Sequence, residues 1–142
     1  MNGSETRRFE ARRDELARAL AFVDAFCAHH GVAHADTLRL TLVVEELFTN
    51  SIVHGHGGGS GAALCIELGV GDAHLRLCFE DEAPPFDPLR HLAEAAPDLD
   101  RPAAERPVGG LGLPLVARMS EHFDYARIDG RNRLSLLIRR EA

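Results

Sequence analysis

The hydrophobic pattern changes along this chain from helical periodicity to strand alternation, and this change constrains the fold more than any other feature. From Asp14 to His30, and again from about Ala35 to His54, apolar residues recur at helical spacing. Residues 64–70 and 75–79 instead alternate apolar with other residues, on either side of a turn at 71–73. The pattern predicts two helices followed by an antiparallel hairpin with one buried face.

Shorter segments complete the predicted order. Thr6 to Ala11 is a candidate edge strand, and Leu111 to Met119 reads as a short helix that begins just after glycines. Phe123 to Ile128 and Arg133 to Arg139 flank a turn at 129–132, which predicts a second hairpin. The order β–α–α–β–β–lid–α–β–β favours an α+β fold, with helices on one face of a mixed, mostly antiparallel sheet.

Residues 82–108 interrupt this pattern. They hold six of the seven prolines, together with many acids and alanines, and show no clear periodicity. A segment of this length inside a compact domain indicates a functional lid or a disordered loop. The total of 142 residues predicts a single domain spanning 1–142, long enough to bury a core.

Composition excludes several classes of function. The net charge of −6 argues against nucleic acid as the main partner, because phosphate backbones require a basic surface. All 16 basic residues are arginine. Without lysine, a P-loop site, a eukaryotic-type kinase site and Schiff-base chemistry are all excluded. Because no stretch approaches the roughly 20 apolar residues of a membrane helix and no signal segment follows the polar N-terminus, we expect a cytoplasmic protein without a membrane partner.

The cysteines and histidines show no metal-ligand spacing. Cys27, Cys65 and Cys78 are interpreted as reduced core or near-core thiols. His29, His30 and His34 cluster near a helix end without companion ligands.

Glu46 and Asn50 are four residues apart, so both side chains leave the same face of the second helix. A carboxylate can accept a proton from an attacking hydroxyl, and an amide oxygen is a hard ligand suited to Mg²⁺. The alternative is a solvated polar face. Apolar residues such as Val43, Val44 and Leu47 crowd the same helix, which favours a functional role for the pair.

Asp81 ends an alternating strand and precedes the rigid segment Ala83-Pro84-Pro85-Phe86. A carboxylate there can accept a hydrogen bond from the amino group of a purine, with Phe86 covering an apolar pocket. An ordinary turn acid is the alternative. Further along, Gly109, Gly110 and Gly112 open a helix whose N–H groups could approach phosphate oxygens, although a glycine turn alone is not specific.

Taken together, the three segments resemble the GHKL ATPase family, specifically the small anti-sigma-factor serine kinases of the RsbW type. Glu46–Asn50–His54–Gly55 resembles that family's N box, Asp81 to Pro88 its G1 box, and Gly109 to Leu113 its G2 box. The resemblance implies a two-layer α/β sandwich that binds ATP with Mg²⁺, and an ATP lid at about 82–112.

Residue roles also follow from the resemblance. Glu46 would be the general base for a serine hydroxyl, Asn50 the Mg²⁺ ligand and Asp81 the acceptor for the adenine amino group. Two departures stand out: Ala83 replaces a glycine, and Asn132 to Ser135 replaces a threonine-rich stretch, so that Ser135 or Asn132 would substitute. The implied nucleotide-binding set is Asn50, Asp81, Ala83, Phe86, Gly109, Gly110, Leu111, Gly112, Leu113 and Ser135.

Relatives of this type act in partner switching. The resemblance therefore implies a STAS-domain antagonist as the phosphorylated substrate, a sigma factor or other target as the sequestered partner, and a homodimer. An alternative is a nucleotide-binding switch that sequesters a partner without phosphorylating it. The output domain of a two-component histidine kinase is disfavoured, since 142 residues leave no room for a phosphoacceptor-helix domain.

Overall fold

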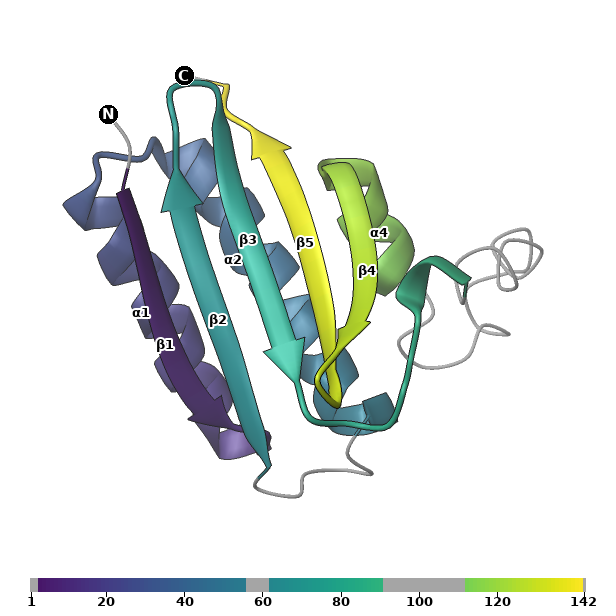
Figure 1. Cartoon of the computed structure of the whole chain (residues 1–142). Helices are drawn as coiled ribbons and strands as arrows, with labels where there is room; N and C mark the ends of the chain where they lie inside the picture. Colours follow the sequence, from purple (N-terminus) through teal and green to yellow (C-terminus); the bar gives the residue numbers. More distant parts are fainter. Residues whose placement is uncertain (1–2, 56–61, 91–111, 142) are drawn as a thin grey trace, which may run out of the picture.

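The computed structural model describes residues 3–55, 62–90 and 112–141, which form two layers (Figure 1). One layer is a five-stranded sheet in the order β1-β2-β3-β5-β4. Helices cover one face of this sheet, as predicted for an α+β fold. The strands are β1 (Gly3–Glu10), β2 (Ala63–Val70), β3 (His74–Asp81), β4 (Glu121–Ile128) and β5 (Arg131–Arg139). The helices are η1 (Arg13–Glu15), α1 (Leu16–His29), α2 (His34–Asn50), η2 (Ser51–Gly55) and α4 (Gly112–Met119).

The sheet differs from the expected mixed type. Each of the four strand pairings in the described residues is antiparallel. The edge strand β1 runs against β2, and β3 runs against β5, although a helix and a long segment separate β3 from β5 in sequence. Period-two alternation marks a strand but carries no information about the direction of a distant partner, which is why the sequence left the pairing open.

The core lies between the two layers. The apolar stripe predicted for α2 is buried as Leu40, Val43, Val44 and Leu47, and it packs with the inward residues of β2, β3 and β5. Each fully buried side chain of this size contributes about 1.5–3 kcal/mol to folding. The largest side chains with less than 2% exposure are Phe26, Phe48, Leu40, Leu47, Ile52, Leu64, Ile66, Leu68, Leu75, Leu77, Leu136 and Ile138.

Gly31 follows the C-terminal end of α1, close to the His30 boundary that the sequence predicted. Its φ of 65° lies in the left-handed region that side chains with a Cβ avoid. The backbone N–H of Val32 then bonds the carbonyl of Cys27 at 2.9 Å. This closing turn lets the chain reverse into α2, which packs beside α1.

The turn between β4 and β5 is tighter than predicted. Asp129 and Gly130 both have positive φ, 51° and 76°, as a two-residue hairpin turn requires. The strand β5 therefore begins at Arg131 rather than Arg133. As a result Asn132 belongs to the strand and lies opposite Asp81 of β3.

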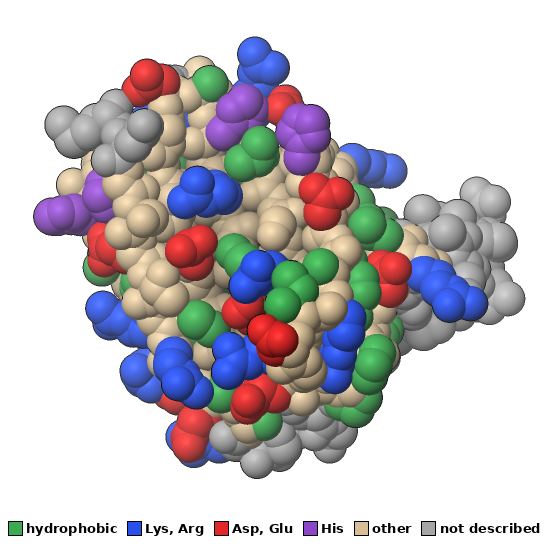
Figure 2. All heavy atoms as spheres, in the orientation of Figure 1, with side chains coloured by type: hydrophobic (Ala, Val, Ile, Leu, Met, Phe, Trp, Pro, Cys, Tyr) green, Lys and Arg blue, Asp and Glu red, His purple; other side chains and the backbone are tan. Residues whose placement is uncertain are grey.

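No described helix covers the other face of the sheet, which carries side chains of both charges (Figure 2). Arg133 on β5 bonds Glu80 on β3 there, with Nε and Nη2 at 3.0 and 2.9 Å from Oε2. All three cysteines are free thiols, as expected; Cys27 is buried, whereas Cys65 and Cys78 are partly exposed. Among the described helices, none is both long and apolar enough to cross a membrane.

Candidate functional site

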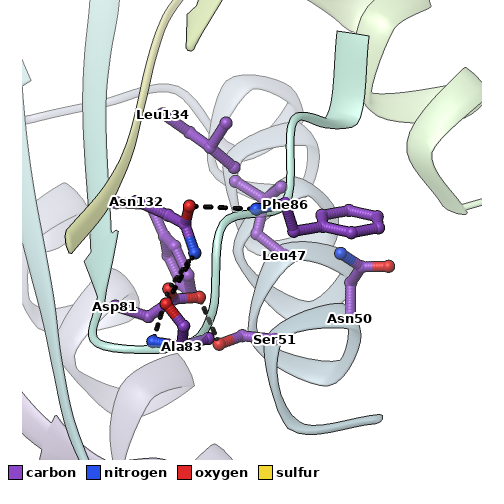
Figure 3. A pocket seen from close by; sticks show the side chains of 9 residues that line it. Leu47, Asn50, Ser51, Asp81, Ala83, Phe86, Asn132 and Leu134 are labelled. Atoms are coloured by element: carbon purple, nitrogen blue, oxygen red, sulfur yellow. Dashed lines mark hydrogen bonds between the residues drawn. The ribbon is translucent and has the colours of Figure 1, made fainter. Parts of the chain in front are cut away.

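A pocket opens where the C-terminal end of α2 meets the end of β3 and the start of β5 (Figure 3). It brings together Asn50, Asp81, Ala83 and Phe86, which the sequence singled out from two of its three segments. The helix contributes the first, the strand end the second, and the proline-containing loop the last two. The full lining is Leu47, Asn50, Ser51, Phe79, Asp81, Ala83, Phe86, Asn132 and Leu134.

Asp81 forms the polar wall of the pocket and is only 8% exposed. A buried carboxylate requires hydrogen-bond donors, and three reach it. The Ser51 hydroxyl donates to Oδ2 at 2.7 Å. The Ala83 N–H and the Asn132 Nδ2 donate to Oδ1 at 3.2 and 2.9 Å. The carboxylate is thus held from helix, loop and neighbouring strand at once.

Asn132 connects the strands to the loop that follows Asp81. Its Nδ2 donates to the carbonyls of Ala83 and Pro84 at 3.3 and 2.9 Å. Its Oδ1 accepts from the Phe86 N–H at 3.1 Å and from the Tyr125 hydroxyl at 2.6 Å. With 5% exposure, this amide is buried and uses both its donor and its acceptor atoms. The loop is therefore fixed to β5.

Asn50 lies at the edge of the pocket, with its amide directed toward the Phe86 side in Figure 3. This amide makes no hydrogen bond to any of the residues that the structure describes. An amide oxygen beside a pocket, with no hydrogen-bond partner in the described part of the chain, fits the coordination of a hard cation such as Mg²⁺, which needs only one or two protein ligands. The donor chemistry therefore fits the predicted metal.

Glu46 lies one turn earlier on α2 and is half-buried. It does not line the pocket itself. Burial raises the pKa of its carboxyl above the ordinary value of 4.5, and the neighbouring charge of Glu45 raises it further. A carboxyl with a raised pKa is a stronger base when ionised, which suits the predicted role.

The helix changes its winding at the site. After Asn50, the five residues Ser51 to Gly55 form a π-helical turn, η2, a feature that is frequent at functional sites. Ser51 is buried at the junction and points its hydroxyl at Asp81. Ser51 was not predicted as a site residue, and its hydroxyl was the available signal for a polar role.

Part of the predicted phosphate region lies outside the described residues. This holds for Gly109, Gly110 and Leu111 and for residues 91–111 of the predicted lid. Gly112 begins α4, and Leu113 follows it with 4% exposure as part of the core cluster. The helix predicted over 111–119 is present as α4, which begins at Gly112, the last of these glycines.

Ser135 does not reach the pocket. It pairs with Cys78 in the β3–β5 register, whereas Asn132 and Leu134 line the pocket from the opposite face of β5. Successive side chains of a strand point to opposite faces of the sheet, so Ser135 cannot lie on the same face as Asn132 and Leu134. Of the two substitutes that the sequence offered, the structure brings Asn132 to Asp81 and leaves Ser135 on the other face.

Comparison with known proteins agrees with this geometry. The chain belongs to the histidine kinase-like ATPase domain family, which matches residues 9–138. This confirms the family and the fold class that the three segments predicted. A search of the curated proteins found no match.

Among solved structures, the chain is similar to "the crystal structure of the RsbU and RsbW domains of Rv1364c from Mycobacterium tuberculosis". The TM-score is 0.63 at 15% identity, with 99% of this chain covered. The chain spans only 34% of that protein chain, so the likeness concerns the fold.

Proposed function

We propose that this protein binds ATP with Mg²⁺ and transfers the γ-phosphoryl group to a serine of a partner protein. One observation carries the proposal. Asp81, buried and held by three hydrogen bonds, lines the same pocket as the Asn50 amide, which bonds to none of the described residues. Asp81 offers a hydrogen-bond acceptor for a nucleobase, and Asn50 offers an oxygen ligand for a cation, as a magnesium–nucleotide site requires.

Each residue has a defined part in this proposal. Asp81 accepts a hydrogen bond from the adenine amino group, and Ala83 and Phe86 form the wall beside the base. Asn50 holds Mg²⁺, which when bound neutralises charge on the phosphates. Gly109, Gly110, Leu111, Gly112 and Leu113 are proposed to surround the phosphates as part of the lid.

The chemical step assigns Glu46 as the base. The serine oxygen attacks the γ-phosphorus, the bond from that phosphorus to the β–γ bridging oxygen breaks, and ADP leaves. The proton of the serine hydroxyl passes to the Glu46 carboxylate. Because such transfer relies on positioning and charge neutralisation, a fixed helix that carries both Glu46 and Asn50 is the relevant scaffold.

The partners are proposed from the RsbW-type resemblance. We propose a STAS-domain protein as phosphoryl acceptor, a sigma factor or another target as the sequestered protein, a homodimer as the working form, and the cytoplasm as its location. We propose further that the whole chain, 1–142, is one domain of this kind.

Glu46→Gln tests the catalytic assignment. The variant keeps the size of the side chain but cannot accept the proton, so we expect phosphoryl transfer to fall by about 10²–10⁴-fold while ATP affinity is retained. Transfer from labelled ATP to purified STAS-domain proteins measures the first quantity, and calorimetry the second. The control is Thr37→Val near the start of the same helix, which removes no charge and in which transfer should continue.

Two outcomes would change the proposal. Transfer retained in Glu46→Gln would contradict the role of Glu46. ATP binding by the wild type without transfer to any STAS protein would favour the alternative, a switch that sequesters its partner without phosphorylating it.

A further inference from the structure

We propose that Ser51 and Asn132 are positioning residues that set the base selectivity of the pocket, by fixing Asp81 so that a single acceptor position remains for the ligand. The inference rests on the proposed function, since it concerns the same nucleotide site. It assigns roles to two side chains through the atoms they hold rather than through contact with the base.

The acceptor positions of Asp81 can be counted. An ionised carboxylate offers about four lone-pair sites, two on each oxygen. Oδ1 accepts from the Ala83 N–H and from Asn132 Nδ2, so both of its positions are used. Oδ2 accepts from the Ser51 hydroxyl alone among the described residues. One position, on Oδ2, is left.

The direction of the Asn132 amide is fixed as well. Two donors, the Phe86 N–H and the Tyr125 hydroxyl, converge on its Oδ1. Rotating the amide by 180° would place its NH₂ group against both donors and its oxygen against the Asp81 carboxylate, and these hydrogen bonds would be lost. The NH₂ group therefore stays on Asp81, and the carboxylate cannot rotate to offer Oδ1 to a ligand.

Selectivity follows from the remaining position. A ligand beside Oδ2 must bring a hydrogen-bond donor, as the 6-amino group of adenine does. A 6-oxo purine would bring a carbonyl oxygen against Oδ2, and neither that carbonyl nor the remaining acceptor position of Oδ2 would receive a hydrogen bond. Without the hydrogen bond from Ser51 or from Asn132, the Asp81 carboxylate can turn away or bind water. The loss of affinity for the 6-oxo ligand and the gain of affinity for the 6-amino ligand then both diminish.

The experiment compares ATP with inosine triphosphate, which carries the 6-oxo group. Calorimetric titration with Mg²⁺ gives the two dissociation constants and their ratio for each protein. We expect the wild type to prefer ATP by at least about tenfold. Ser51→Ala and Asn132→Ala should each reduce that ratio by about threefold or more, through weaker binding of ATP and tighter binding of inosine triphosphate.

A matched control is Thr37→Val. It removes a hydroxyl from the other end of α2, where Thr37 Oγ1 donates to the Ala33 carbonyl at 3.0 Å, and the ratio should not move. Ser51→Ala removes one oxygen only and keeps the test decisive if Asn132→Ala fails to fold.

The possible results separate cleanly. Equal weakening of both nucleotides, or an unchanged ratio in Ser51→Ala, would show a merely structural role and overturn the inference. A wild type that binds neither nucleotide would instead defeat the proposed function from which it starts.

Discussion

At the residue scale, the environment of Glu46 makes a prediction about pH. A general base must be ionised, so phosphoryl transfer should rise with pH through the pKa of Glu46. Burial and the charge of Glu45 raise that pKa above 4.5. Glu45→Gln removes the like charge, and the inflection of the pH profile should move to lower pH. Transfer rates at saturating ATP, measured from acidic to neutral pH, provide the test.

The direction of the shift is the informative result. An inflection that stays in place in Glu45→Gln, or moves upward, would show that another group controls the profile. Thr37→Val on the same helix serves as a control, because it removes no charge and should leave the profile unchanged.

The candidate site could be predicted from sequence only where a segment carries its own signal. Glu46, Asn50 and Asp81 stand out by spacing and by their place at an element's end, and the structure places Asn50 and Asp81 at one pocket. Asn132 was less accessible to such reasoning, because the turn was expected to extend over 129–132. Its role depends on the β3–β5 register, which joins residues 51 positions apart and has no local signature.

At the element scale, the end of α1 offers a test of backbone conformation. Gly31 has φ of 65°, and a Cβ added there would meet nothing within 4 Å. Any loss of stability in Gly31→Ala would therefore come from the backbone conformation and not from a steric clash. We expect it to lower the free energy of unfolding by about 1 kcal/mol, measured by urea denaturation. Gly31→Asn should lose less, since asparagine tolerates this region better.

An alanine variant as stable as the wild type would contradict this assignment of strain. A much larger loss would also contradict it, since a steric clash would then have to be present where the structure shows open space.

Helices and strands themselves followed closely from periodicity, because each buries one face and the repeat of that face is local. Their order along the chain matches the prediction. The spatial order β1-β2-β3-β5-β4 did not follow, since it depends on which long-range pairings bury the most apolar surface. The Asp129-Gly130 dipeptide was the one local signal that would have corrected the start of β5.

At the scale of the whole molecule, Asp36 ties the start of α2 to the end of the chain. It is fully buried, accepts from Arg39 Nη2 at 2.6 Å, and accepts from the Glu141 N–H at 3.0 Å. Asp36→Ala removes the buried carboxylate of this pair, which leaves the Glu141 N–H without its acceptor and Arg39, which is 24% exposed, without its ion-pair partner. We expect the free energy of unfolding to fall by about 3 kcal/mol in denaturant titrations.

The comparison variant is Asp14→Ala, whose exposed pair with Arg12 should contribute less than about 1 kcal/mol. Equal losses in the two variants would mean that the Asp36 connection does not stabilise the fold as its burial indicates.

The most direct test of the whole account is calorimetric titration of ATP into the purified protein, with and without Mg²⁺, beside Asn50→Ala. The account predicts that Mg²⁺ increases the affinity of the wild type for ATP. In Asn50→Ala, the factor by which Mg²⁺ increases this affinity should be smaller by at least about tenfold, because a metal contact is removed. Thr37→Val should titrate like the wild type. A wild type that binds no ATP, or an Asn50→Ala variant with the full Mg²⁺ dependence, would contradict the assignment of this pocket as a magnesium–nucleotide site.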